Sequence, residues 1–253
     1  MKSSALFGLW RSLLIYYAIP GRAAGWRRLY RPFISPGDLC FDLGAHVGSR
    51  SAAMLALGAR VVAVEPQPDY AAVLKRLYGR IPNFTLVSQA VGQQPGRARL
   101  LVSTRKPTVS TLSPEWAAEV AKTPGFAGVA WDAQLETEAT TLDALISEFG
   151  LPAFCKIDVE GSELDVLLGL SQPISALSFE YIPAAGERAL QCLKRLQGLG
   201  TYHFNLVEGE KPHFSLAAWA DGHTLAAKLE SLPSSARAGE VFAQLQSAMN
   251  SAG

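Results

Sequence analysis

Short runs of β-branched and aromatic residues alternate with helix-like segments along most of this chain. The runs expected to form the main strands are residues 38–44, 60–66, 83–92, 153–159, 176–181, 202–208 and 239–245. Helices are expected between them, at residues 49–59, 68–80, 140–150, 162–170 and 186–200. This alternation is typical of an α/β fold with a mostly parallel sheet. The sequence therefore predicts one doubly wound domain with about seven main strands and helices on both faces.

The length of 253 residues, of which 49% are hydrophobic, suits one sizeable core. Residues 36–253 are expected to form a single domain, to which residues 98–103 add a hairpin strand. Residues 103–137 have weak periodicity and several prolines, which predicts a lid-like insertion. Residues 1–35 are expected to be a basic, apolar N-terminal helical extension.

The distribution of charge separates the start of the chain from the rest. Residues 1–31 carry six basic and no acidic side chains, while the whole chain has a formal net charge of +1. The remainder is therefore acidic, which argues against a nucleic-acid partner. Residues 5–20 are apolar but are interrupted by Arg11 and too short to span a membrane. They are expected either to pack on the domain as a helix or to contact a membrane peripherally as an amphipathic anchor.

The three cysteines lie in apolar segments and show no CxxC spacing. This pattern predicts neither a disulfide nor a zinc site, and it indicates a reducing compartment. The expected location is the cytoplasm, with peripheral contact at the inner face of a membrane as the alternative.

Four acidic residues lie within eight positions of the stretch CKIDVEGSELDVLLGL, where the fourth main strand should lead into a helix. Two of them have local structural explanations. Ser162 and Asp165 have the spacing of a helix capping box, and Glu163 would lie in the first helical turn, where the helix dipole favours a negative charge.

Asp158 and Glu160 have no such explanation. Residues two apart in a strand share a face, so Lys156, Asp158 and Glu160 are expected on one side. Unpaired buried charges are costly, and these side chains should therefore reach the crevice beyond the carboxyl ends of the strands, where such sheets bind ligands. The alternative is a structural role, in which Lys156 forms an ion pair with Asp158 or Glu160 that only fixes the end of the strand.

A second set of polar and glycine residues follows the first two strands. Gly44 and Gly48 bracket a tight turn preceded by Asp42, and Glu65 ends the second strand at about the 20-residue spacing of a ribose-binding acid. The spacing G-x-x-x-G differs from that of pyrophosphate sites. An acid before the first glycine would repel pyrophosphate but suit a cationic amino acid group. The pattern favours S-adenosylmethionine over a dinucleotide.

These segments together resemble the FkbM-type S-adenosylmethionine-dependent methyltransferases. The resemblance runs from about Pro36 to Ala243 through FDLGAHVG, VVAVEPQP, SQAVG, TTLDALI and CKIDVEGSELDVLLGL, with KIDVEGSE its most specific element. It implies a Rossmann-like class I methyltransferase sheet with an antiparallel last strand. It also implies methyl transfer to hydroxyl oxygens of small molecules or glycans.

The resemblance assigns cofactor-binding positions residue by residue. Asp42, Gly44, Ala45 and Gly48 would hold the methionine end, Glu65 the ribose with Gln67 beside it, and Gln89 with Ala90 would border the adenine. His46 stands where the family often has asparagine, and it is expected either to contact the site or to act as a general base. Asp158 would face the methyl group and the acceptor.

The sequence thus predicts an S-adenosylmethionine-dependent O-methyltransferase with a small-molecule or saccharide acceptor. Asp158 or Glu160 is expected to bind the acceptor hydroxyl and remove its proton, with Lys156 setting the ionisation of this coupled pair. Trp116, in the insertion, would suit a sugar ring, and no metal is expected. The alternatives are an NAD-dependent Rossmann oxidoreductase and a non-catalytic, membrane-associated domain that binds S-adenosylmethionine.

Overall fold

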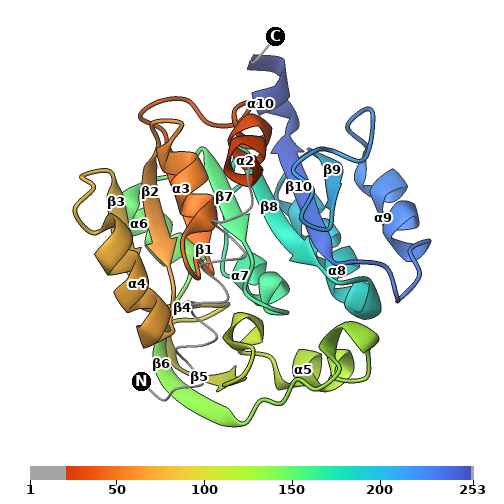
Figure 1. Cartoon of the computed structure of the whole chain (residues 1–253). Helices are drawn as coiled ribbons and strands as arrows, with labels where there is room; N and C mark the ends of the chain where they lie inside the picture. Colours follow the sequence, from red (N-terminus) through yellow and green to blue (C-terminus); the bar gives the residue numbers. More distant parts are fainter. Residues whose placement is uncertain (1–20, 252–253) are drawn as a thin grey trace.

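A seven-stranded sheet forms the centre of the computed structural model, which describes residues 21–251 (Figure 1). Its strands lie in the order β3-β2-β1-β7-β8-β10-β9. They are β1 (Leu39–Leu43), β2 (Arg60–Val64), β3 (Phe84–Val87), β7 (Phe154–Ile157), β8 (Ala176–Tyr181), β9 (Tyr202–Glu208) and β10 (Gly239–Leu245). Neighbouring strands are parallel except at β10, which is antiparallel to both β8 and β9. The predicted α/β, Rossmann-like class I methyltransferase sheet with a reversed last strand is confirmed.

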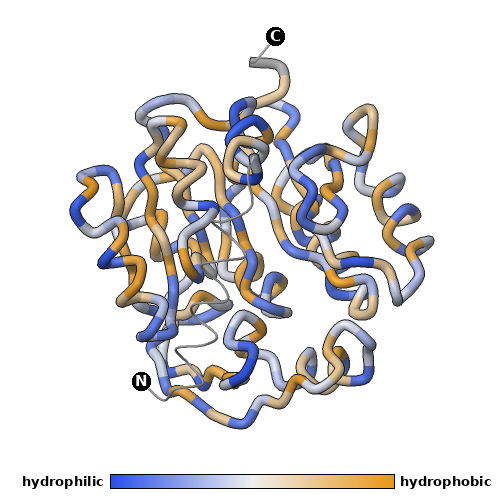
Figure 2. The backbone as a smooth tube through the Cα atoms, viewed as in Figure 1, coloured by the Kyte–Doolittle hydropathy of each residue, from blue (hydrophilic) through white to orange (hydrophobic). Residues whose placement is uncertain are grey.

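Helices cover both faces of this sheet (Figure 1). One face carries α2 (Arg22–Tyr30), α3 (Ser49–Leu55) and α4 (Pro68–Tyr78), and the other carries α6 (Leu142–Phe149), α7 (Glu163–Leu168), α8 (Gly186–Leu199) and α9 (Gly222–Glu230). Each face of the sheet packs against its helices in a hydrophobic core. Successive strand residues point to opposite faces, so Cys40 is buried in the core next to α2, α3 and α4, and Phe41 is buried in the core next to the other helices. Figure 2 shows hydrophobic residues concentrated along these central strands. The last helix, α10 (Gln246–Ser251), follows β10.

Helix α2, the first helix of the described residues, packs into the core on the face that it shares with α3 and α4. Trp26, Leu29 and Tyr30 are buried. The ring centroid of Tyr30 lies 5.1 Å from that of Phe154 on β7. The described part of the predicted extension therefore packs on the main sheet, whereas the apolar stretch 5–20 lies outside the described residues. Within residues 21–251, no helix combines the length and the apolar character needed to cross a membrane.

A second sheet of three strands lies beyond the carboxyl ends of the main parallel strands in the described chain (Figure 1). It consists of β4 (Ala90–Val91), β6 (Ala133–Thr140) and β5 (Gly96–Val102), in that order. The prediction of one strand over residues 83–92 is wrong in part, because the chain leaves the main sheet after Val87 at polar Ser88 and Gln89. The end of the predicted insertion belongs to β6, whose side chains alternate between exposed and partly buried.

Between β5 and β6, the insertion folds on a small core that it shares with Ile182 and Ala185, which follow β8. It contains η1 (Pro107–Val109), α5 (Pro114–Val120) and η2 (Pro124–Phe126). The centroid of the Trp116 ring lies 5.4 Å from that of Phe126 and 6.1 Å from that of Trp131. Because only 1% of Trp116 is exposed, this side chain is not available to stack on a sugar, contrary to the expectation from sequence.

Candidate functional site

A cavity opens at the carboxyl ends of β1, β2 and β7, where the main sheet meets the second sheet and the insertion. Ten of the predicted site residues line it: Gly44, Ala45, His46, Glu65, Gln67, Gln89, Ala90, Lys156, Asp158 and Glu160. Leu100, Thr108, Ser110 and Leu112 close another side. Among the described residues, Asp42 and Gly48 are the predicted site residues outside this lining. Strand ends in parallel α/β sheets are the usual place for a ligand.

The two glycines of the turn after β1 have different surroundings. Both have positive φ angles, +71° at Gly44 and +82° at Gly48, which glycine adopts without strain. A side chain at Gly44 would collide with the carbonyl oxygen of Asp158, so this glycine lets β1 and β7 end close together at the cavity. A side chain at Gly48 would instead collide with Leu74 and Tyr78 of α4. Gly48 therefore serves helix packing next to the cavity.

Asp42 does not line the cavity, but it forms an ion pair with Lys156, which does. The two residues are in register on neighbouring strands and share a face, which brings Lys156 Nζ to 3.3 Å from Asp42 Oδ1. Asp42 is fully buried and also accepts a hydrogen bond from Ser51 Oγ at 2.6 Å. Lys156 Nζ extends to Asp158 Oδ2 at 3.2 Å and donates to the carbonyl of Gly44 at 3.0 Å. Lys156 thus links a buried carboxylate to one on the cavity wall.

Burial opposes the charge on Lys156, but the carboxylates of Asp158 and Asp42 outweigh this effect and raise the pKa of the ammonium. Lys156 therefore stays protonated at any physiological pH. It acts as a fixed positive charge that holds Asp158 in place.

Glu65 follows β2 and faces the same cavity. It is buried, and each of its carboxylate oxygens accepts one backbone N–H at 2.9 Å, from His46 and from Gln67. Burial raises the pKa of Glu65 to about 7, although these hydrogen bonds and Lys156 favour its ionised form. Each oxygen keeps a lone pair, so Glu65 can accept further hydrogen bonds from a diol.

His46 is held in the turn by its backbone, with a φ of 51°, and its ring centroid lies 4.1 Å from that of Tyr70. Burial and the nearby charge of Lys156 lower the pKa of His46 to about 3. The imidazole is therefore neutral at physiological pH and a weak base. This weak basicity favours a role for His46 in contacting the site over a role as general base.

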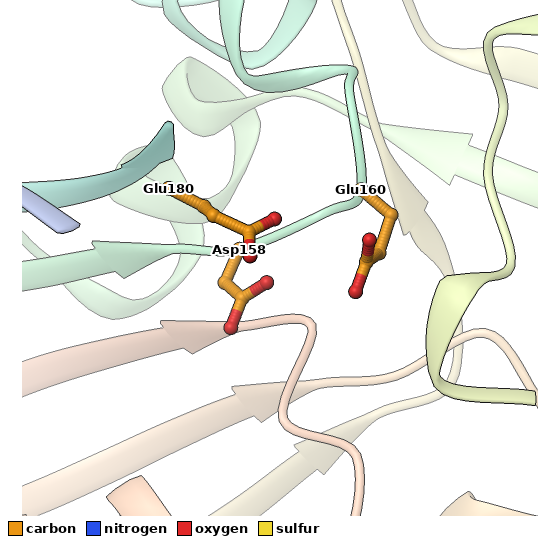
Figure 3. A group of neighbouring side chains, drawn as sticks. All are labelled: Asp158, Glu160 and Glu180. Carbon is orange, nitrogen blue, oxygen red and sulfur yellow. The ribbon is translucent and has the colours of Figure 1, made fainter. Parts of the chain in front are cut away.

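The carboxylates of Asp158 and Glu160, which line the cavity, lie close to that of Glu180, which is outside its lining (Figure 3). Oxygens of Asp158, Glu160 and Glu180 all lie within 4.8 Å of one another. Strand β7 ends at Ile157, so the expected strand alternation does not place Glu160, and this reasoning from sequence is wrong. Instead, a left-handed backbone turn at Glu160, with a φ of 54°, brings its side chain back toward Asp158.

The crowding of these acids affects their protonation. Burial and the carboxylates of Asp158 and Glu163 raise the pKa of Glu160, and burial and the carboxylates of Glu160 and Asp158 raise that of Glu180. The sequence analysis missed Glu180. Its signal is an acid near the end of the apolar strand ALSFEY.

The three carboxylates are an all-oxygen group of the kind that could hold a magnesium or calcium ion. Proton sharing between Glu160 and Glu180 would also relieve repulsion within the group. The absence of a metal in the reaction stays a prediction from the sequence, and a chelator tests it below.

The predicted capping box at the start of α7 is wrong, because the Ser162 side chain makes no capping hydrogen bond. The carboxylate of Glu163 turns back instead and accepts the N–H groups of Val159 at 3.0 Å and Gly161 at 3.2 Å. Burial raises the pKa of Glu163 to about 7. Glu163 therefore shapes the loop that carries Asp158 and Glu160.

Arg50 is a cavity-lining residue that the sequence analysis missed. Its guanidinium donates to Glu240 Oε1 at 2.7 Å and to Glu210 Oε2 at 3.3 Å, and lies over the ring of Trp26 at 3.2 Å from the centroid. The sequence signal is a basic side chain among small residues in SRSAAML, which fits a structural or a ligand-binding role equally well.

The sequence matches the model of the methyltransferase FkbM domain over residues 42–205, more than half of the chain. The chain belongs to the FkbM methyltransferase family. This match includes the turn after β1, Glu65 and the acidic loop after β7, so the resemblance inferred from these motifs is confirmed. Use of S-adenosylmethionine follows from this membership. The search of curated proteins found no match.

The matches among solved structures include several methyltransferases. A precorrin-6y C5,15-methyltransferase from Geobacter metallireducens has a TM-score of 0.43 and 13% identity, with 88% of this chain and 87% of that chain covered. An S-adenosylmethionine-dependent O-methyltransferase from Thermotoga maritima has a TM-score of 0.43 and 13% identity, with 89% and 65% covered. An rRNA methylase from Streptococcus thermophilus has a TM-score of 0.45 and 11% identity, with 87% and 94% covered.

Proposed function

We propose that this FkbM-family chain is an S-adenosylmethionine-dependent O-methyltransferase that acts on a hydroxyl of a small molecule or glycan. The observation that carries the proposal is that Glu65 and the acidic pair of Asp158 and Glu160 line the same cavity. A neutral hydroxyl must lose a proton when it is methylated, and a carboxylate within reach can take it. The acidic lining also disfavours a phosphodiester backbone as the acceptor.

The lining residues fit the cofactor. Glu65 would accept hydrogen bonds from the two ribose hydroxyls through its remaining lone pairs. Gly44, Ala45 and His46 would border the methionine end, and Gln89 with Ala90 would border the adenine. When bound, S-adenosylmethionine supplies an electrophilic methyl group on a sulfonium. Asp42 and Gly48 would act indirectly, Asp42 by holding Lys156 and Gly48 by packing the turn against α4.

The chain contributes orientation and a proton acceptor. Asp158 and Glu160 would bind the acceptor hydroxyl and hold its oxygen in line, which can lower a barrier by about 7–11 kcal/mol. One carboxylate of the pair then takes the proton, and we assign this role to the pair because both carboxylates line the cavity and lie close together. Lys156 keeps Asp158 in position during this transfer.

Transfer of a labelled methyl group tests the proposal directly. S-adenosylmethionine is incubated with the full chain and a set of glycans, glycolipids and alcohols, with and without EDTA. We expect labelled ether products, formed equally well in EDTA. Loss of transfer in EDTA would contradict the expectation of no metal. Cofactor binding without transfer to any acceptor would favour the non-catalytic, membrane-associated alternative.

A thermal-shift comparison addresses the oxidoreductase alternative. S-adenosylhomocysteine is expected to raise the Tm of the protein, because a ligand that binds only the folded state stabilises it, and NAD is expected to leave the Tm unchanged. A rise with NAD alone would contradict the proposed cofactor.

The affinity for S-adenosylhomocysteine is expected to increase about tenfold from about pH 6 to about pH 8. The pKa of Glu65 is raised to about 7, and the ionised form is the better acceptor for ribose hydroxyls, so binding strengthens as the pH rises through this value. Calorimetric titration at several pH values measures the trend. Glu65→Gln, which stays neutral, should bind weakly with little pH dependence in this range. Affinity of the unmodified protein that falls with pH would contradict the role of Glu65.

A further inference from the structure

Gln67 is bonded to the insertion through both ends of its side-chain amide. It precedes α4 at the N-cap position, but its side chain makes no capping hydrogen bond there. Gln67 Nε2 instead donates to the carbonyl of Pro107 at 3.2 Å. Gln67 Oε1 lies 3.2 Å from Ser110 Oγ, whose single proton can go either to Gln67 or to the carbonyl of Pro107 at 2.8 Å. A residue beside Glu65 is thus connected to a segment 40 positions later in the chain.

Residues 107–112, which we call the wall segment, form one side of the cavity. Thr108, Ser110 and Leu112 line the same space as Glu65 and Asp158. The segment is also attached to the second sheet and the insertion, because Thr111 pairs with Leu101 and the Trp131 indole donates to the carbonyl of Val109 at 2.8 Å. In the described part of the chain, Gln67 supplies the side-chain hydrogen bonds that connect the wall segment to the main domain.

We propose that Gln67 is a positioning residue that holds the wall segment over the cavity, so that the acceptor meets a formed site. The resemblance assigned Gln67 to the cofactor, but both ends of its amide contact Pro107 and Ser110, which orients the side chain toward the wall segment. The effect on methyl transfer rests on the proposed function. The effect on the wall segment does not rest on the proposed function, because the contact of Gln67 with Pro107 and Ser110 lies within the chain and needs no ligand.

Hydrogen exchange on the full chain without any ligand tests the contact. In Gln67→Leu, amides 109–111 are expected to exchange about tenfold faster than in the unmodified protein, because the hydrogen bonding of the Gln67 amide that opposes opening is lost. The exposed Gln134 of β6 provides the matched control, and Gln134→Leu should leave these amides unchanged. Ser110→Ala should give a smaller increase. The effects of the two changes should be less than additive in the double variant, because both act on the contact between Gln67 and Ser110, while Ser110→Ala also removes a bond to the carbonyl of Pro107.

Steady-state kinetics then separate positioning from cofactor binding. Gln67→Leu is expected to raise KM for the acceptor several-fold, with a smaller change in kcat and nearly unchanged affinity for S-adenosylhomocysteine. Unchanged exchange at amides 109–111 in both Gln67→Leu and Ser110→Ala would overturn the proposal. So would weakened cofactor binding without faster exchange, which would make Gln67 a direct cofactor ligand. A chain without methyltransferase activity would leave the exchange result standing, so the two failures are distinguishable.

Discussion

Asp158→Asn is expected to slow methyl transfer by about 10²–10⁴-fold while the affinity for S-adenosylhomocysteine stays nearly unchanged. The substitution keeps the shape of the side chain but removes its ability to accept a proton. Lys156 retains Asp42 at 3.3 Å and the carbonyl of Gly44 at 3.0 Å, so the cavity wall is expected to persist. Single-turnover rates and calorimetric titration measure the two quantities separately.

Glu160→Gln should show the same separation between rate and binding, because the two acids form one proton-accepting pair. Asp69→Asn is the matched control, since Asp69 is an exposed acid in the first turn of α4. It should leave both rate and affinity unchanged. Full activity in both Asp158→Asn and Glu160→Gln would refute the assignment of the base to this pair.

Lys156→Met is expected to lower the free energy of unfolding by about 3–5 kcal/mol, which is the usual effect of removing one partner of a buried ion pair. Lys156 and Asp42 are 3% and 0% exposed, so Asp42 would keep a buried charge with only the Ser51 hydroxyl as its partner. Chemical denaturation monitored by circular dichroism measures the loss. Lys194→Met, at an exposed position of α8, should change stability by less than about 0.5 kcal/mol.

A second substitution shows whether the loss of stability comes from an unpaired buried charge on Asp42 or from poor packing of the new methionine. If the buried charge of Asp42 causes the loss, the double variant Lys156→Met with Asp42→Asn should recover part of the stability. A double variant that is less stable by the sum of both single effects would show that the ion pair is not the cause. Equal stability of Lys156→Met and Lys194→Met would contradict the account of the pair altogether.

The main sheet and most of the cavity lining could be predicted because both leave local signals. Buried parallel strands appear as short apolar runs, and the residues directly after them meet at one edge of the sheet. Glu65 and Asp158 could be placed in one site from this rule alone. Lys156 could be paired with an acid, although the sequence suggested Asp158 or Glu160 and did not anticipate Asp42 as a second partner.

Features that depend on distant partners could not be predicted in this way. Glu180 joins the acidic cluster because β7 and β8 are neighbours, which no local pattern records. Gln67 faces Pro107 only once the insertion has folded. Trp116 looked like an exposed loop residue, but it packs against Gly161, where any side chain on the glycine would collide with its ring.

Local signals were also misread in some places. Strand β6 has the period-two alternation of a half-buried strand, yet its polar positions made it look like the end of a loop. The helix α9, between the two closing strands, was not predicted. At α7, the spacing of Ser162 and Asp165 suggested a capping box, but Ser162 makes no capping hydrogen bond, and the carboxylate of Glu163 accepts the N–H groups of Val159 and Gly161 in the preceding loop.

The central claim is that one cavity holds the sulfonium nucleoside beside the carboxylates that receive the acceptor. Isothermal titration calorimetry of the full chain with S-adenosylhomocysteine tests it most directly, at two temperatures so that a small enthalpy at one does not hide binding. We predict saturable binding that is greatly weakened in Glu65→Ala. A folded protein that shows no binding heat at either temperature would contradict the account.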